Sequence, residues 1–112
     1  MRADDRVRLK HMVDAAEVLA TFVDGRTSQD LSRDRMLLFA IVRAIEILGE
    51  AASRLSPEAQ TQVGDVPWSS IIAMRNRLIH GYFDIDTEIV WKTATLEVPA
   101  LLGALKRAVS EA

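Results

Sequence analysis

The segment MLLFAIVRAIEILGEAASRL, residues 36–55, constrains the fold most, because apolar side chains would cover nearly the whole circumference of a helix built from it. A helix of this kind is buried on more than one side. We predict such a helix over residues 33–55. In a chain of 112 residues, its second burying surface is either the rest of a monomeric bundle or another copy of the chain. The pattern alone favours neither.

The residues before this segment predict a first helix with one apolar stripe. Asp4 or Asp5 is placed to cap its start, and Gly25 marks its end. A polar connection, RTSQDLS, follows, and its Ser32 is suited to be the N-cap of the second helix. The apolar side chains of the stripe are spaced three or four residues apart: Leu9, Met12, Ala16, Leu19 and Val23.

The residues after the segment begin with a short helix. Ser56 as its N-cap and Pro57 in the first helical position are typical of a helix start. Asp65 or Val66, followed by Pro67, then opens a longer helix through WSSIIAMRNRLIH.

Gly81 is well placed to end that longer helix. Asp86 or Thr87 caps a last helix that runs to about Val109, and Pro99 inside it should kink it. These elements predict an all-α fold, an up-and-down bundle of four main helices plus a short one. The length predicts a single domain over residues 1–112.

Composition limits the classes of function. The net charge is −2, so any action on RNA has to come from a local basic site. The chain has no cysteine, which excludes disulfides and thiolate metal sites and fits a reducing compartment. The N-terminal MRADDRVRLK lacks an apolar signal core, and no apolar run approaches the length that a membrane helix needs. We therefore expect a cytoplasmic protein that is not membrane-bound.

The stretch RNRLIHGYFD, residues 75–84, gathers scarce reactive side chains. The chain has two histidines and one tyrosine, and His80 and Tyr82 both lie here. Arg75 and His80 are five positions apart, about 140° on an ideal helix, so they converge only if the helix ends near His80. Gly81 predicts that end. Asn76, four residues before His80, shares its face and could orient the imidazole.

Spacing alone also allows a purely structural interpretation of this stretch. A histidine in the last turn of a helix interacts favourably with the helix dipole. Arg75 and Arg77 could be a solvated face, and Tyr82 could be a core residue with its hydroxyl at the rim.

A family resemblance favours the functional interpretation of this stretch over the structural one. MRNRLIHGYFDID, followed by IVW, strongly resembles the HepT family, a branch of the HEPN domains. The family motif is Arg, four residues, His, any residue, Tyr, and Arg75, His80 and Tyr82 match it position for position. Asn76 matches the polar residue that usually follows the arginine. IEILGEAASRL and PWSSIIAMRN are similar to the family's second helix and its approach to the motif, so the resemblance covers about residues 5–105.

The resemblance implies a helical homodimer that acts as a metal-independent ribonuclease without a cofactor. It implies the toxin of a type VII HepT/MntA toxin–antitoxin system, with Arg75 and His80 as catalytic residues. The antitoxin would be a minimal nucleotidyltransferase of the MntA type that transfers AMP to Tyr82. The alternative function is a non-catalytic helical binding module that partners such a nucleotidyltransferase.

The residue types suit RNA cleavage. The 2′-OH of RNA is a nucleophile beside each phosphodiester, so cleavage needs proton transfer and charge stabilisation. Histidine can take or give a proton near neutral pH, and the guanidinium of Arg75 offers a planar fork of donors to phosphate oxygens. His80 alone cannot easily stand on both sides of an in-line displacement. Two copies around a two-fold axis would supply two histidines, and the product would be a 2′,3′-cyclic phosphate.

Other polar residues are weaker candidates. Glu46 and Glu50, four apart, continue a ridge with Arg43 and Arg54, which indicates a charge ladder. The Gly-Glu pair at 49–50 recurs in the family resemblance, so Glu50 is a candidate supporting residue with Asn76. His11 and Asp14 could be imagined as metal ligands, but two ligands without a third make a poor zinc or iron site. We therefore expect no metal.

Overall fold

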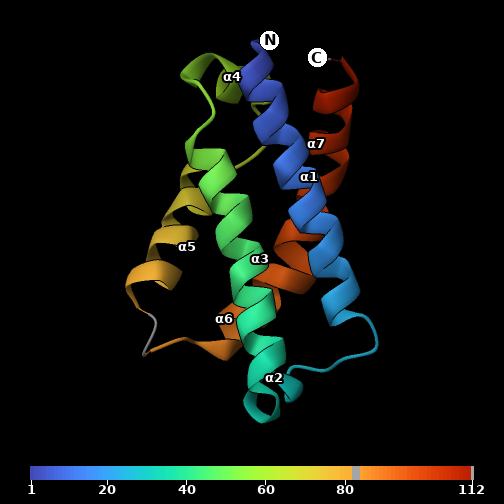
Figure 1. Cartoon of the computed structure of the whole chain (residues 1–112), viewed down its shortest axis with the longest axis vertical. Coiled ribbons are helices and arrows are strands. Elements are labelled where there is room, and N and C mark those ends of the chain that lie inside the picture. The colour runs from blue at the N-terminus through green and yellow to red at the C-terminus, as the bar shows by residue number, and fades with distance from the viewer. Residues whose placement is uncertain (82–83, 112) are drawn as a thin grey trace.

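The computed structural model describes residues 1–81 and 84–111, and this part of the chain contains helices and no strand (Figure 1). The predicted all-α bundle is confirmed. Its four main helices are α1, α3, α5 and the continuous run from α6 to α7. The elements are α1 (Ala3–Val23), α2 (Asp30–Arg33), α3 (Arg35–Ser53), α4 (Pro57–Gln62), α5 (Trp68–His80), α6 (Thr87–Lys92), the π-helical turn η1 (Thr93–Glu97) and α7 (Val98–Glu111).

Helix α3 is the centre of the bundle. It lies between α1 and α5 in Figure 1, and α7 packs on the other side of α1. Burial on several sides within one chain explains most of its apolar circumference. Three large apolar side chains of α3 nevertheless stay exposed, with exposed fractions of 83% for Met36, 54% for Phe39 and 39% for Ile47. The largest fully buried side chains of the core are Leu9, Met12, Leu19, Leu31, Ile41, Val90 and Leu105.

The start of α1 differs from the prediction. Neither Asp4 nor Asp5 is its N-cap, because the helix begins at Ala3 and no side chain caps it. Asp5 is buried instead, and its carboxylate accepts hydrogen bonds from the backbone N–H of Ser56 at 2.9 Å and from its hydroxyl at 2.6 Å. Ser56 Oγ in turn accepts from Ala59 N–H, so the predicted N-cap of α4 is confirmed and is tied to α1.

The start of α3 also differs. Ser32 is not its N-cap, because residues 30–33 form the additional short helix α2. Leu31 is fully buried and anchors that turn in the core. Asp34 caps α3 by accepting a hydrogen bond from Leu37 N–H at 3.1 Å.

The last helix is irregular near Pro99, as predicted. Asp86 caps its start through hydrogen bonds from the N–H groups of Glu88 and Ile89. Just before Pro99 the helix widens into η1, where Val98 N–H bonds to the Thr93 carbonyl. Because proline donates no hydrogen bond and its ring crowds the preceding turn, such a local widening is a natural response.

Helix α5 is fixed at both ends. Trp68 at its start is buried, and its indole N–H donates to the carbonyls of Gln60 and Val63 at 2.9 and 3.0 Å. The helix ends at Gly81, as predicted, but Gly81 has a φ of −104° rather than the left-handed value. A side chain there would instead crowd the Arg77 carbonyl, 2.8 Å from a Cβ position. Within the part of the chain that the structure describes, no helix combines the length and apolarity needed to cross a membrane.

The Asp5–Ser56 contact gives a stability prediction. Hydrogen bonds from Ser56 lower the pKa of Asp5 below its ordinary value. Asp5→Ala leaves two donors of Ser56 without their acceptor and should lower the free energy of unfolding by about 1–3 kcal/mol. Asp4→Ala, an exposed neighbour in the same turn, should change it by less than about 0.5 kcal/mol. Urea unfolding at neutral pH measures both.

The same contact predicts a pH dependence of definite sign. Because folding depresses the pKa of Asp5, its contribution is complete above about pH 5 and is lost as the pH falls and the carboxylate takes up a proton. The difference between wild type and Asp5→Ala should therefore shrink in acid. An equal difference at pH 7 and pH 3 would contradict this assignment.

Candidate active site

The site begins with the close approach of α5 to α3 at Gly49. A Cβ at Gly49 would overlap the Cβ of Arg75 and would lie 3.3 Å from the Ile71 carbonyl oxygen. The absence of a side chain at this position therefore lets the backbone of α3 accept the stem of Arg75. Gly49 thus determines where Arg75 enters the bundle.

The guanidinium of Arg75 is held by two oxygen acceptors. Its Nη2 donates to Glu50 Oε2 at 2.5 Å, and its Nη1 donates to Asn76 Oδ1 at 2.9 Å. Its Nε is buried and has no hydrogen-bond partner within the described residues. The side chain is 27% exposed. Arg75 is therefore oriented by its neighbours yet can still be reached from solvent.

Glu50 lies between two arginines. Its Oε1 accepts from Arg54 Nε at 2.8 Å, while its Oε2 binds Arg75. The hydrogen bond from Arg54 and the charge of Arg75 hold the pKa of Glu50 below its usual value, so the carboxylate stays ionised. The predicted charge ladder on α3 is present, since Arg43 also reaches Glu46 at 3.8 Å. Glu50 has the additional contact with Arg75 that its candidate supporting role requires.

His80 lies in the last turn of α5 and is exposed. Gly81 N–H bonds to the Arg77 carbonyl at 2.8 Å, so α-helical bonding extends to the residue after His80. Arg75 and His80 are therefore both helical residues of α5, five positions apart, and their convergence stays a prediction. The imidazole makes no hydrogen bond to any residue in the ranges 1–81 and 84–111. Tyr82 lies outside the described residues.

Asn76 has a different partner from the predicted one. Its amide oxygen accepts from Arg75 rather than orienting His80. Gly49, in turn, was not predicted as a determinant of the site. A glycine inside a strongly helical pattern costs about 1 kcal/mol relative to alanine, and this cost was the signal that a close packing contact requires it.

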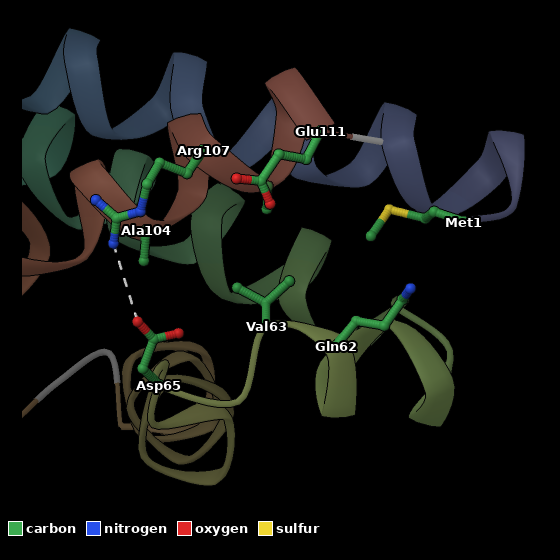
Figure 2. A pocket seen from close by; sticks show the side chains of 8 residues that line it. Met1, Gln62, Val63, Asp65, Ala104, Arg107 and Glu111 are labelled. Atoms are coloured by element: carbon green, nitrogen blue, oxygen red, sulfur yellow. Dashed lines mark ion pairs between the residues drawn. The ribbon is translucent and has the colours of Figure 1, made fainter.

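Several cavities lie away from this cluster, and two of them border α7. One, of about 320 Å³, is at the end of the bundle where Met1, α4 and α7 meet, and the ion pair of Asp65 with Arg107 borders it (Figure 2). The other, of about 700 Å³, separates α5 from η1 and α7 above a floor that includes Ile45 and Leu48. Neither is lined by Arg75, Glu50 or His80.

Comparisons with known proteins place the chain among ribonuclease-related sequences. The profile of the family described as "Ribonuclease HepT-like" matches residues 12–108. The chain is 38% identical over 101 residues to "Putative RNase TTE0752" of Caldanaerobacter subterraneus subsp. tengcongensis, and the match covers 90% of both chains. It is 30% identical over 107 residues to "Probable ribonuclease HepT" of Thermococcus cleftensis, covering 96% of this chain and 97% of the relative. No solved structure matches it.

The role of Gly49 is tested by Gly49→Ala. The added methyl group should push α3 and α5 apart and lower the free energy of unfolding by about 1–3 kcal/mol. Gly103→Ala is the matched control, because a Cβ on this exposed helical glycine comes no closer than 3.4 Å to the flexible end of Arg107. Its expected effect is a stabilisation of about 0.5–1 kcal/mol from helix propensity. Equal effects of the two substitutions would show that the α3–α5 contact is not tight.

Proposed function

The chain belongs to the HepT-like ribonuclease family, and from this premise we propose that it cleaves RNA without a metal ion, with Arg75 and His80 as its catalytic residues. The observation that carries the proposal is the support of the Arg75 guanidinium by Glu50 and Asn76. An arginine held in this way is preorganised, so little reorganisation is needed when charge develops on a phosphate.

The proposed reaction is an internal transesterification. The 2′-OH attacks the adjacent phosphorus, and the bond from phosphorus to the 5′ oxygen of the next nucleotide breaks. One imidazole removes the 2′-OH proton, and another donates a proton to the leaving oxygen. Donors of Arg75 stabilise the charge on the non-bridging oxygens. The products are a 2′,3′-cyclic phosphate and a 5′-OH.

This reaction needs two histidines, and each chain provides one at the motif. In one chain, moreover, His80 is exposed while Arg75 points to α3. We therefore propose a homodimer in which α3 and the end of α5 lie near the two-fold axis. The exposed apolar side chains of Met36, Phe39 and Ile79 support this choice, because burial against a second copy would remove them from water.

Regulation is proposed from the family resemblance. The chain would be the toxin of a type VII toxin–antitoxin system and would pair with an MntA-type nucleotidyltransferase that adds AMP to Tyr82. Tyr82 follows His80 by two residues in the sequence. A phosphodiester attached there would bring negative charge and bulk to the catalytic segment. It would compete with the phosphate of RNA for Arg75 and would silence cleavage.

The catalytic assignment predicts that Arg75→Ala and His80→Ala each lower the rate of RNA cleavage by at least about 100-fold, the scale expected when a general acid–base group is lost. Arg75→Lys should also fail to restore the full rate, because lysine lacks the planar fork. Arg77→Ala is the control, since it removes an exposed arginine from the same helix. Cleavage of a labelled RNA is measured with EDTA present, and circular dichroism checks the fold.

Two results would overturn this assignment. One is full cleavage by a folded His80→Ala protein. The other is activity that EDTA abolishes and a divalent ion restores. A wild-type protein that binds the nucleotidyltransferase but cleaves no RNA would instead favour the non-catalytic binding module.

The modification proposal is tested by intact-mass measurement after incubation with the partner nucleotidyltransferase, ATP and magnesium. Wild type should gain the mass of AMP and lose cleavage activity. Tyr82→Phe should retain at least part of its cleavage activity and gain no mass, because it lacks the acceptor oxygen. Addition of AMP to Tyr82→Phe would place the acceptor elsewhere.

A further inference from the structure

A second group of cations borders Glu50 on the surface between α1 and α3. A hollow of about 210 Å³ lies there, which we call the α1–α3 groove. Helix α1 contributes two basic side chains to it, and α3 with the residue that follows it contributes two more, around one carboxylate and a small apolar floor. Its lining residues are Arg8, His11, Arg43, Ile47, Glu50, Ala51 and Arg54.

The donors of this groove are largely free to bind an anion. Arg8 makes no hydrogen bond or ion pair within the described residues. Arg43 is 72% exposed, and its contact with Glu46, at 3.8 Å, is long. Arg54 uses its Nε for Glu50, which leaves its two terminal nitrogens without an ion pair in the described part of the chain. The chain as a whole has a net charge of −2, so these arginines form a local basic site.

The carboxylate in the groove does not cancel this charge. Both oxygens of Glu50 already accept hydrogen bonds, one from Arg54 and one from Arg75. An incoming phosphate would therefore meet arginine donors, because the negative charge of Glu50 is already paired with Arg54 and Arg75. Through Glu50 the groove is also continuous with Arg75, since Arg54, Glu50 and Arg75 form one chain of ion pairs.

We propose that the α1–α3 groove binds the sugar–phosphate backbone of single-stranded RNA next to the phosphodiester held by Arg75. This inference rests on the proposed function and adds the path of the substrate. Arginine contacts to phosphates position a nucleic acid without reading its bases. The groove therefore provides affinity and alignment along the strand, whereas Arg75 and His80 perform the reaction.

The test measures RNA binding separately from cleavage. A fluorescent single-stranded RNA with a 2′-O-methyl group on every nucleotide lacks the attacking hydroxyl but keeps its phosphates. Its affinity for the wild-type protein is measured by fluorescence anisotropy over a range of salt concentrations. The variants are Arg8→Ala, Arg43→Ala and the double substitution. Arg54 is left unchanged because it also supports Glu50.

Lys10→Ala is the matched control. Lys10 is an exposed cation on α1 that lies two residues from Arg8 and therefore about 200° around the helix. The Lys10→Ala substitution removes the same charge from the protein as a groove substitution does, but it leaves the charge of the groove unchanged.

Each groove substitution should weaken RNA binding about tenfold, as expected for the loss of a charged hydrogen bond. It should also lower the slope of log affinity against log salt concentration by about 0.7 for each phosphate that the protein no longer neutralises. Lys10→Ala should change neither quantity. Two results would overturn the proposal that the groove binds RNA. One is a double variant with the affinity and salt slope of the wild type, and the other is an equal weakening of RNA binding in Lys10→Ala.

Cleavage of unmodified RNA by the wild-type protein tests the proposed function independently. If the protein cleaves RNA but the groove variants bind RNA normally, the proposed role of the groove is wrong and the proposed function stands. If binding depends on the groove but no cleavage occurs, the ribonuclease proposal is wrong and the binding site stands. If the wild-type protein neither binds nor cleaves RNA, both are wrong.

Discussion

The contact of α5 with α3 at Gly49 is the constraint on which the rest of the site depends. Because Gly49 has no side chain, the stem of Arg75 can lie against the backbone of α3. From that position its guanidinium reaches Glu50, the next residue of α3, and its own neighbour Asn76. Arg75 on α5 and the Gly-Glu pair on α3 therefore form one structural unit, although Arg75 and Glu50 are 25 positions apart in the sequence.

The geometry of α5 is the basis for the proposal of a dimer. Since α5 stays helical through His80, Arg75 and His80 keep the angular separation of about 140° that a regular helix gives residues five apart. Arg75 faces α3, and His80 is exposed at the end of α5. The dimer that we propose would cover the exposed apolar residues near the start of α3, with the ends of the two α5 helices near the two-fold axis. In the proposed dimer, the packing of α5 on α3 orients Arg75, and the exposed apolar surface of α3 forms the interface. Both would then contribute to RNA cleavage.

Much of this architecture could be predicted from the sequence because it depends on local signals. The apolar periodicity predicted the main helices, and Ser56, Gly81 and Asp86 mark helix ends where the structure has them. The predictions failed where a distant residue changes the local outcome. Asp5 resembles a helix cap but pairs with Ser56, which lies 51 positions away. Asn76 shares a helix face with His80, yet its amide oxygen accepts a hydrogen bond from Arg75. The importance of Gly49 depends on which helix packs against it, and helical periodicity does not specify that partner.

The most direct test of the account is the rate of RNA cleavage as a function of protein concentration, measured with EDTA present and beside sedimentation of the same samples. If two copies complete the site, the rate per chain should rise with the fraction of dimer and should fall towards zero in samples diluted to monomer. Phe39→Glu, which places a charge on the exposed apolar part of α3, should move both transitions to higher concentration together. A monomeric protein that cleaves RNA at the full rate per chain would contradict the account.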